Sequence, residues 1–163
     1  MYCVNCGTKL IEKTDGIDGP VPYCPKCEKF QYPTFNSAIS AIIFNPDKTK
    51  ILLIEQYGRK DNILVAGYVT KGENCKQTLT REIGEEVGLS IDSYYYNDNE
   101  YFGPTNTLIH NYIVIAKDEN IHIAPEEVDL ARWYTRDEAV KVIKPNSLAQ
   151  HLLNLALMKI DTL

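Results

Sequence analysis

One stretch, residues 67–89, restricts the folding of this chain more than any other. It reads GYVTKGENCKQTLTREIGEEVGL. Residues 76–87 are mainly good helix formers and carry apolar side chains at every fourth position, which predicts a helix with one buried face. We expect Asn74 to cap this helix, with Gln77 reaching back, and Gly88 to end it in the left-handed conformation. The stretch therefore predicts a loop followed by a capped helix.

Four glutamates lie within 14 residues of this stretch: Glu73, Glu82, Glu85 and Glu86. Residues three and four apart share one side of a helix, so the last three carboxylates are expected close together, where like charges repel. A bound divalent cation explains this arrangement, because Mg²⁺ takes carboxylate oxygens together with water and phosphate oxygens. A solvated acidic face is the alternative interpretation.

The spacing of the stretch resembles the complete pattern of the Nudix box. The matching residues are Gly67, Glu73, Arg81-Glu82-Ile83, Glu85-Glu86 and Gly88-Leu89. A chance match has a probability on the order of 10⁻⁹ per window. The Nudix family comprises hydrolases that cut nucleoside diphosphates linked to another group.

The resemblance implies a metal-assisted hydrolysis in which Glu82, Glu85 and Glu86 hold Mg²⁺ or Mn²⁺. It also implies that Arg81 pairs with Glu73 and braces the loop against the helix. One carboxylate must accept the proton of the attacking water. This base differs between branches of the family, and Glu85, Glu82 and Glu127 are all candidates, with Glu85 favoured.

The first segment, residues 1–33, contains two C-x2-C pairs separated by 17 residues: Cys3, Cys6, Cys24 and Cys27. Each pair can present two thiolates to one ion, and two pairs complete a tetrahedral Zn²⁺ site with no open position for catalysis. We expect a zinc ribbon in which the metal supplies the folding free energy. Two disulfides are the rival interpretation, which a reducing cytoplasm disfavours.

The remainder of the chain alternates strand-like runs with helical segments. Strands are expected at residues 38–44, 51–55, 63–69, 91–96, 108–116 and 131–134, and a polar loop at 97–106. Helices are expected at 135–143, capped by Thr135 and Glu138, and at 147–160. This order predicts an α/β fold with a mixed sheet covered on both faces. The resemblance implies the same: a Nudix α/β/α sandwich over residues 36–163, preceded by the small zinc ribbon.

Composition narrows the choice of partner. The net charge of −5 and the absence of a lysine or arginine block disfavour a large nucleic-acid footprint, although four lysines in the first segment leave a local patch. Apolar runs are short and the N-terminus does not resemble a signal peptide, so we expect no membrane partner and a cytoplasmic location.

A zinc ribbon followed by a Nudix domain resembles the bacterial NADH pyrophosphatase branch of the family. Counting from the box without gaps, this branch implies that Glu127 is a further metal ligand and that Ala66 offers a backbone ligand. The same count puts Ala149 at a substrate-contacting position. The branch also implies a homodimer.

The NADH pyrophosphatase branch carries a signature, S-Q-P-W-P-F-P-x-S, that falls here on residues 99–107. Only Phe102, at the tryptophan position, and the final hydroxyl of Thr107 remain. Tyr101 and Phe102 lie beside a Gly-Pro turn and are candidates to stack on a nucleobase.

The favoured interpretation is an enzyme that cleaves the diphosphate of a small nucleotide derivative such as NAD(H) or ADP-ribose. Two alternatives are a hydrolase of RNA caps, including NAD caps, and a non-catalytic nucleotide sensor on a Nudix fold. Sensors tolerate the loss of carboxylates, and this box retains all of them.

Overall fold

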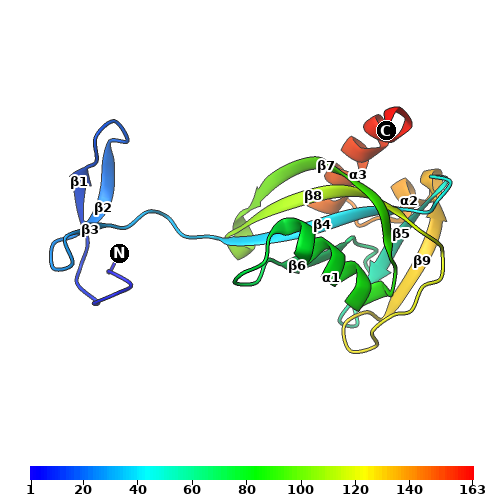
Figure 1. The fold of residues 1–163 in the computed structure, drawn as a ribbon, viewed down its shortest axis with the longest axis horizontal. Helices are drawn as coiled ribbons and strands as arrows, with labels where there is room; N and C mark the ends of the chain where they lie inside the picture. The colour runs from blue at the N-terminus through cyan, green and yellow to red at the C-terminus, as the bar shows by residue number, and fades with distance from the viewer. The chain divides into compact units, whose positions relative to one another are not determined.

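The computed structural model describes all 163 residues, which form two compact units, Met1–Phe35 and Asn36–Leu163. Figure 1 shows their elements in chain order. The first unit is a three-stranded antiparallel sheet of β1 (Ile11–Thr14), β2 (Pro20–Cys24) and β3 (Lys29–Phe30).

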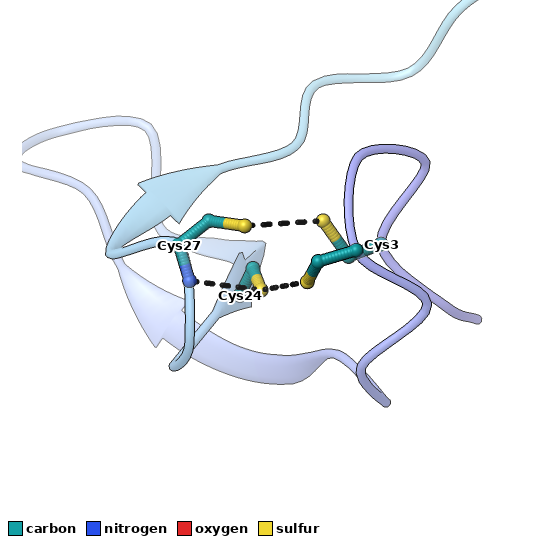
Figure 2. Close-up of side chains that lie close together, drawn as sticks. Cys3, Cys24 and Cys27 are labelled. Carbon is teal, nitrogen blue, oxygen red and sulfur yellow. Dashed lines mark hydrogen bonds between the residues drawn. The ribbon is translucent and has the colours of Figure 1, made fainter.

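The first unit has almost no hydrophobic core. Apart from two of its cysteines, Val21 is its only buried apolar residue, and it is still 8% exposed. Its four cysteines gather instead at one place, and three of them are labelled in Figure 2. Burial of apolar surface therefore contributes little to the stability of this unit.

The second unit is built on a six-stranded mixed sheet. Its strands are β4 (Asn36–Phe44), β5 (Lys50–Glu55), β6 (Val65–Tyr68), β7 (Ile91–Phe102), β8 (Thr107–Ala116) and β9 (Leu130–Thr135). The strand order is β7-β8-β4-β5-β9, and β6 pairs with β4. Strands β4 and β8 run parallel, whereas every other pair is antiparallel.

Helices cover both faces of this sheet. Helix α1 (Cys75–Val87) lies on one face, and α2 (Arg136–Val142) and α3 (Leu148–Lys159) lie on the other (Figure 1). Two short 3₁₀ turns, Gly103–Thr105 and Ile160–Thr162, complete the elements. The predicted α/β/α sandwich is confirmed.

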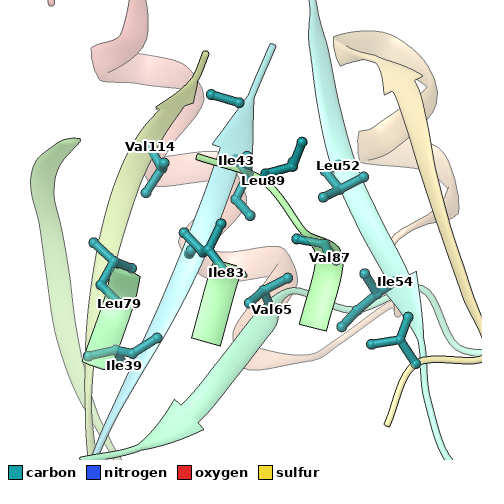
Figure 3. Packing of buried hydrophobic residues seen from close by; sticks show 13 residues of the cluster. Ile39, Ile43, Leu52, Ile54, Val65, Leu79, Ile83, Val87, Leu89 and Val114 are labelled. Carbon is teal, nitrogen blue, oxygen red and sulfur yellow. The ribbon is translucent and has the colours of Figure 1, made fainter. Parts of the chain in front are cut away.

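Alternation along β4 divides the core into two layers. Ile39 and Ile43 pack toward α1, in the layer shown in Figure 3 with Leu79, Ile83 and Val87 of that helix. The alternate residues of β4, including Ile42 and Phe44, pack in the opposite layer, which is formed with α3. Helix α1 buries the apolar stripe that its sequence periodicity predicted.

The predicted helix ends are also present. Asn74 and Gln77 form a capping box at the start of α1, and Thr135 and Glu138 form one at the start of α2. Gly88 ends α1 with a φ of 69°. A Cβ atom at this position would lie 2.7 Å from the Cβ of His122, so only glycine fits.

The loop predicted at residues 97–106 is wrong for its first six residues, because β7 continues to Phe102. Strand β7 pairs with β8 as far as Phe102 opposite Thr107, with a bulge between Tyr96 and Asp98. The bulge residue, Asn97, is buried and hydrogen-bonded. Tertiary pairing thus outweighs the low strand propensity of these polar residues.

None of the helices is long and apolar enough to cross a membrane.

Candidate active site

The loop between β6 and α1 is braced by the ion pair that the resemblance implied. Arg81 donates to both oxygens of Glu73, from Nε to Oε1 at 2.8 Å and from Nη2 to Oε2 at 2.9 Å. The Thr78 hydroxyl donates to the same carboxylate at 3.0 Å. Arg81 is the main reason why the pKa of Glu73 lies well below its ordinary value. Glu73 is therefore ionised at neutral pH and fixes the loop to the helix.

Arg81 has further partners that the sequence did not predict. Its Nη1 donates to Glu82 Oε1 at 2.8 Å and to Glu85 Oε2 at 3.0 Å. Its Nη2 also donates to the carbonyl of Tyr68 at 3.3 Å. One guanidinium thus offsets the repulsion between three carboxylates, and a planar fork of donors suits this task better than an ammonium would.

Glu82 lies directly against the backbone of Gly67. A Cβ atom at position 67 would be 1.9 Å from the carboxyl carbon of Glu82, a distance that no pair of atoms tolerates. Glu82 is only 8% exposed, and this burial is the main reason why its pKa is raised, against the opposing effect of Arg81. The glycine of the box therefore makes the space into which this carboxylate fits.

Replacing Gly67 with alanine is expected to displace Glu82 and to weaken Mn²⁺ binding by about 10- to 100-fold, the cost typical of disturbing a metal ligand. Titration calorimetry with Mn²⁺ measures this change. Gly84→Ala is the matched control, because a Cβ atom there meets nothing within 4 Å. Equal Mn²⁺ affinities in the two variants would show that the space at Gly67 does not matter.

Glu86 is the most deeply buried carboxylate of the box. It is 3% exposed, and its Oε1 accepts a hydrogen bond from Gln56 Nε2 at 2.9 Å. Its Oε2 is buried without any hydrogen-bond partner. Burial is the main cause that raises the pKa of Glu86 to about 7, and nearby Glu82 and Glu127 raise it further. A buried acceptor without a donor is costly, and a divalent cation would satisfy it.

Glu82 and Glu86 line an open cleft of about 440 Å³, which we call the glutamate cleft. Its other lining residues are Ala38, Tyr57, Ala66, Gly67, Tyr68, Thr70, Arg81, Thr105, Thr107, Ile109 and Glu127. The structure thus brings Glu127 and Ala66 to the same cleft as the two box glutamates. Glu85 does not line it: its side chain is 58% exposed and contacts Arg81.

A second hollow of about 480 Å³, which we call the apolar pocket, lies on the α3 side of the sheet and shares Ala66 and Ile109 with the glutamate cleft. Its other lining residues are Ser40, Ile63, Leu64, Phe102, Lys144, Asn146, Ser147, Leu148, Ala149 and Leu152. Phe102 and Ala149, two expected substrate contacts, are therefore in one pocket. Tyr101 is not, and its hydroxyl donates to Asn106 Oδ1 at 2.6 Å.

The strand at residues 97–102 explains why two neighbouring aromatic residues differ. Successive side chains of a strand point to opposite faces of the sheet, so Tyr101 and Phe102 cannot face the same pocket. The sequence prediction placed both in a loop and therefore grouped them.

The four cysteines form a separate cluster in the first unit. All four sulfurs lie within 4.8 Å of one another, and no other group of three or more Cys, His, Asp or Glu ligand atoms in the chain is gathered so closely. The Sγ atoms of Cys3 and Cys27 are 3.9 Å apart, and those of Cys6 and Cys24 are 3.5 Å apart. All are free thiols, so the two disulfides of the rival interpretation are not formed. A tetrahedron of Zn–S bonds has edges of about 3.8 Å, which this cluster fits.

Several residues of the site were missed by the sequence analysis, and two of them lie close to the box glutamates. Gln56 donates to Glu86 from just beyond the end of β5, and Tyr57 lines the glutamate cleft. Neither belongs to a motif. The only local signal in the sequence is Gly58, which marks a turn; in the structure Tyr57 and Gly58 both have positive φ.

The comparisons with known proteins agree with this geometry. The profile of the NUDIX domain matches residues 34–154. The NAD-capped RNA hydrolase ndx-9 of Caenorhabditis elegans is 33% identical over 135 residues, which cover 80% of this chain and 36% of that protein. The NAD-capped RNA hydrolase NudC of Pseudomonas aeruginosa is 24% identical over 158 residues, which cover 97% of this chain and 56% of that protein. The chain thus spans between about a third and just over half of the length of these relatives.

A solved structure shows the same fold. The NUDIX domain of Shewanella oneidensis NrtR, complexed with ADP ribose, matches with a TM-score of 0.67 and 15% identity, over 85% of this chain and 94% of that one. The domain profile covers most of the second unit, and the box within it is complete. This chain belongs to the Nudix family.

Proposed function

We propose that this chain is a divalent-metal-dependent Nudix hydrolase that cleaves the diphosphate of a nucleoside diphosphate derivative such as NAD(H) or ADP-ribose. The observation that carries the proposal is the buried, unpartnered Oε2 of Glu86, which lies in one cleft with Glu82 and Glu127. The adjoining apolar pocket suits a nucleoside, and the glutamate cleft suits the diphosphate. The domain with the same fold that is complexed with ADP ribose supports the substrate class.

Glu82, Glu86 and the backbone of Ala66 would hold Mg²⁺ or Mn²⁺. The donor set fits, because hard cations prefer carboxylate and carbonyl oxygens. When bound, such a cation neutralises charge on the phosphoryl oxygens and favours deprotonation of water. Gln56 orients Glu86 by donating to one of its oxygens and leaving the other for the ion. Arg81 holds Glu73, Glu82 and Glu85 in place through its hydrogen bonds to these three carboxylates.

A carboxylate must also accept the proton of the attacking water. Glu85 is the base that the resemblance favours, but Arg81 binds it and it lies outside the lining of the cleft. Glu127 lines the cleft and has neither a hydrogen bond nor an ion pair through its side chain, so the geometry supports Glu127 as the base. A larger fall in kcat for Glu127→Gln than for Glu85→Gln supports this assignment, and the reverse order restores Glu85.

We propose structural Zn²⁺ for the four cysteines. The two pairs of sulfurs have the separations that a tetrahedral site needs, and four thiolates leave no position for water or substrate. The homodimer implied by the resemblance stays a prediction, which light scattering of the purified chain tests.

The test of the proposed activity is a product-release assay of the full chain with Mg²⁺ and with Mn²⁺. The panel holds NADH, NAD⁺, ADP-ribose, FAD, diadenosine polyphosphates and nucleoside triphosphates. Metal-dependent release of a mononucleotide from NADH, NAD⁺ or ADP-ribose is the expected result. No turnover of any compound by folded, zinc-loaded protein would contradict it.

A second candidate is hydrolysis of NAD-capped RNA, because two relatives carry that name. The pyrophosphate bond of such a cap is the one found in NAD, so the same site serves both substrates. RNA adds phosphate contacts whose affinity falls steeply with salt. Turnover of capped RNA that falls much more steeply with added KCl than turnover of NAD⁺ favours this candidate.

A further inference from the structure

A chain of buried hydrogen bonds crosses the second unit from the end of α3 to the apolar pocket. Lys159 Nζ donates to Asn97 Oδ1 at 3.0 Å. Asn97 Nδ2 then donates to Asn111 Oδ1 at 2.9 Å, and Asn111 Nδ2 donates to Ser40 Oγ at 2.6 Å. The last three residues are at most 5% exposed. Polar groups buried in a core are costly unless every one is satisfied, and here the amides satisfy one another.

The direction of this hydrogen-bond chain is fixed at its distant end. Asn97 Nδ2 also donates to the carbonyl of Leu152 at 2.9 Å, and a carbonyl can only accept. Lys159 can only donate, so the oxygen of the Asn97 amide must face it. The orientation of Asn97 then sets that of Asn111, which must present an N–H to Ser40. The Ser40 oxygen is therefore an acceptor within the protein.

Ser40 is left with a hydroxyl hydrogen that no protein group accepts. The hydrogen bond from Asn111 is the only one that its side chain makes. Ser40 is 5% exposed and lines the apolar pocket, whose nearby walls are Phe102, Ile109 and Ala149. The pocket thus combines apolar walls with a buried hydroxyl donor that has no acceptor in the protein.

We propose that the apolar pocket binds the adenine ring of the substrate and that Ser40 donates its hydroxyl hydrogen to a ring nitrogen of that base. This inference rests on the proposed function, because it assigns the base attached to the diphosphate. The pocket and the glutamate cleft share Ala66 and Ile109, so one ligand reaches both. Asn97 and Asn111 are positioning residues that act through Ser40.

The chemistry of the pocket favours adenine over nicotinamide. Adenine is neutral and carries three ring nitrogens that accept hydrogen bonds. The nicotinamide ring of NAD⁺ is cationic and has no accepting ring nitrogen. Lys144 lines the same pocket, where it pairs with Asp61 at 2.8 Å. A cationic ring would have to leave water for apolar walls without gaining a carboxylate that is free to pair with it.

The test combines atom changes in the ligand with changes in the protein. Wild-type chain and Ser40→Ala are assayed with ADP-ribose and with its 1-deaza, 3-deaza and 7-deaza adenine analogues, in each of which a ring nitrogen is replaced by C–H. Ser40→Ala is expected to raise the KM for ADP-ribose by roughly tenfold, with little change in kcat. A tenfold change in KM corresponds to the loss of about one hydrogen bond. One analogue is expected to raise the KM of the wild type by the same factor. Ser40→Ala assayed with that analogue is expected to show no further rise in KM.

A second variant tests the direction of the hydrogen bond without removing the hydroxyl. In Asn111→Asp, a carboxylate oxygen faces Ser40, accepts its hydrogen and turns it away from the pocket. The same rise in KM as in Ser40→Ala is expected. Ser93→Ala changes a serine on β7 that is outside both the hydrogen-bond chain and the pocket lining, and it is expected to leave KM unchanged. Circular dichroism and thermal melting verify that each variant folds.

The outcomes separate this inference from the proposed function. If the wild type turns over ADP-ribose but Ser40→Ala leaves KM unchanged, or if its effect adds to that of every analogue, the inference is overturned. An unchanged KM in Asn111→Asp overturns the assigned direction. If the wild type turns over nothing, AMP binding by calorimetry decides: roughly tenfold weaker binding in Ser40→Ala supports the inference, and no AMP binding to the wild type overturns it.

Discussion

Replacing Glu86 with glutamine is expected to lower kcat by about 100-fold or more, because the change removes the charge that most directly balances a divalent cation. The substitution keeps the shape of the side chain and its contact with Gln56. Turnover of ADP-ribose or NAD⁺ at saturating Mg²⁺ measures the effect. The matched control is Glu126→Gln, an exposed carboxylate outside the glutamate cleft, which is expected to retain wild-type turnover.

The same substitution is expected to stabilise the metal-free protein, and the effect should depend on pH. Burial raises the pKa of Glu86 to about 7 in the folded chain. The folded state therefore holds this proton more tightly than the unfolded state, so its stabilising contribution is complete below about pH 4.5 and is lost as the pH rises through 7. Glutamine does not ionise, so we expect little change in Tm at pH 5 and a gain of several degrees at pH 8.

Melting curves in a hard-cation chelator at the two pH values test this prediction. Addition of Mn²⁺ at pH 8 should stabilise the wild type but not Glu86→Gln, because only the ionised carboxylate binds the ion. A variant that is less active but no more stable at pH 8 would mean that Glu86 is not strained in the metal-free site.

Removal of zinc is expected to unfold the first unit and leave the second unit folded. Val21 is the only buried apolar residue of the first unit other than cysteine, so little remains to hold its three short strands together. Structural zinc in comparable small domains contributes about 10–16 kcal/mol of binding free energy. Hydrogen exchange of the full chain should therefore lose protection in residues 1–35 after treatment with a zinc chelator, and Asn36–Leu163 should keep it.

Cys24→Ser should reproduce this result and abolish the stoichiometric zinc that elemental analysis finds in the wild type. Cys75→Ser is the matched control, because Cys75 begins α1 and lies outside the cluster. Undiminished protection of residues 1–35 in the metal-free chain would show that the unit folds without the metal.

The parts of the fold with local sequence determinants were predictable. The capping box of α1 involves two residues that are three apart, and Gly88 comes directly after the last residue of the helix. Both ends of α1 are therefore determined by residues close together in the sequence. The cysteine pairs are local in the same way, and the Arg81–Glu73 ion pair was implied by the resemblance to the Nudix box.

Features created by pairing distant segments were not predictable. The polar residues 97–102 form a strand because β8 offers them a partner, and only this pairing separates Tyr101 from Phe102. Gln56 reaches Glu86 from 30 residues away, and no pattern in the sequence joins them. The additional contacts of Arg81 with Glu82 and Glu85 depend on its side-chain conformation, which spacing alone does not determine.

The bulge at Asn97 has a consequence for how the chain is completed during synthesis. Its amide needs Asn111 from β8 and the carbonyl of Leu152 from α3, the latter 55 residues further along the chain. A nascent chain that has not yet emerged from the ribosome beyond α3 holds an incompletely satisfied amide on β7, an edge strand of its sheet. Productive closure of the second unit therefore waits for the C-terminal helix, and a chain truncated before Leu152 should remain a substrate for chaperones and proteases rather than a working fragment.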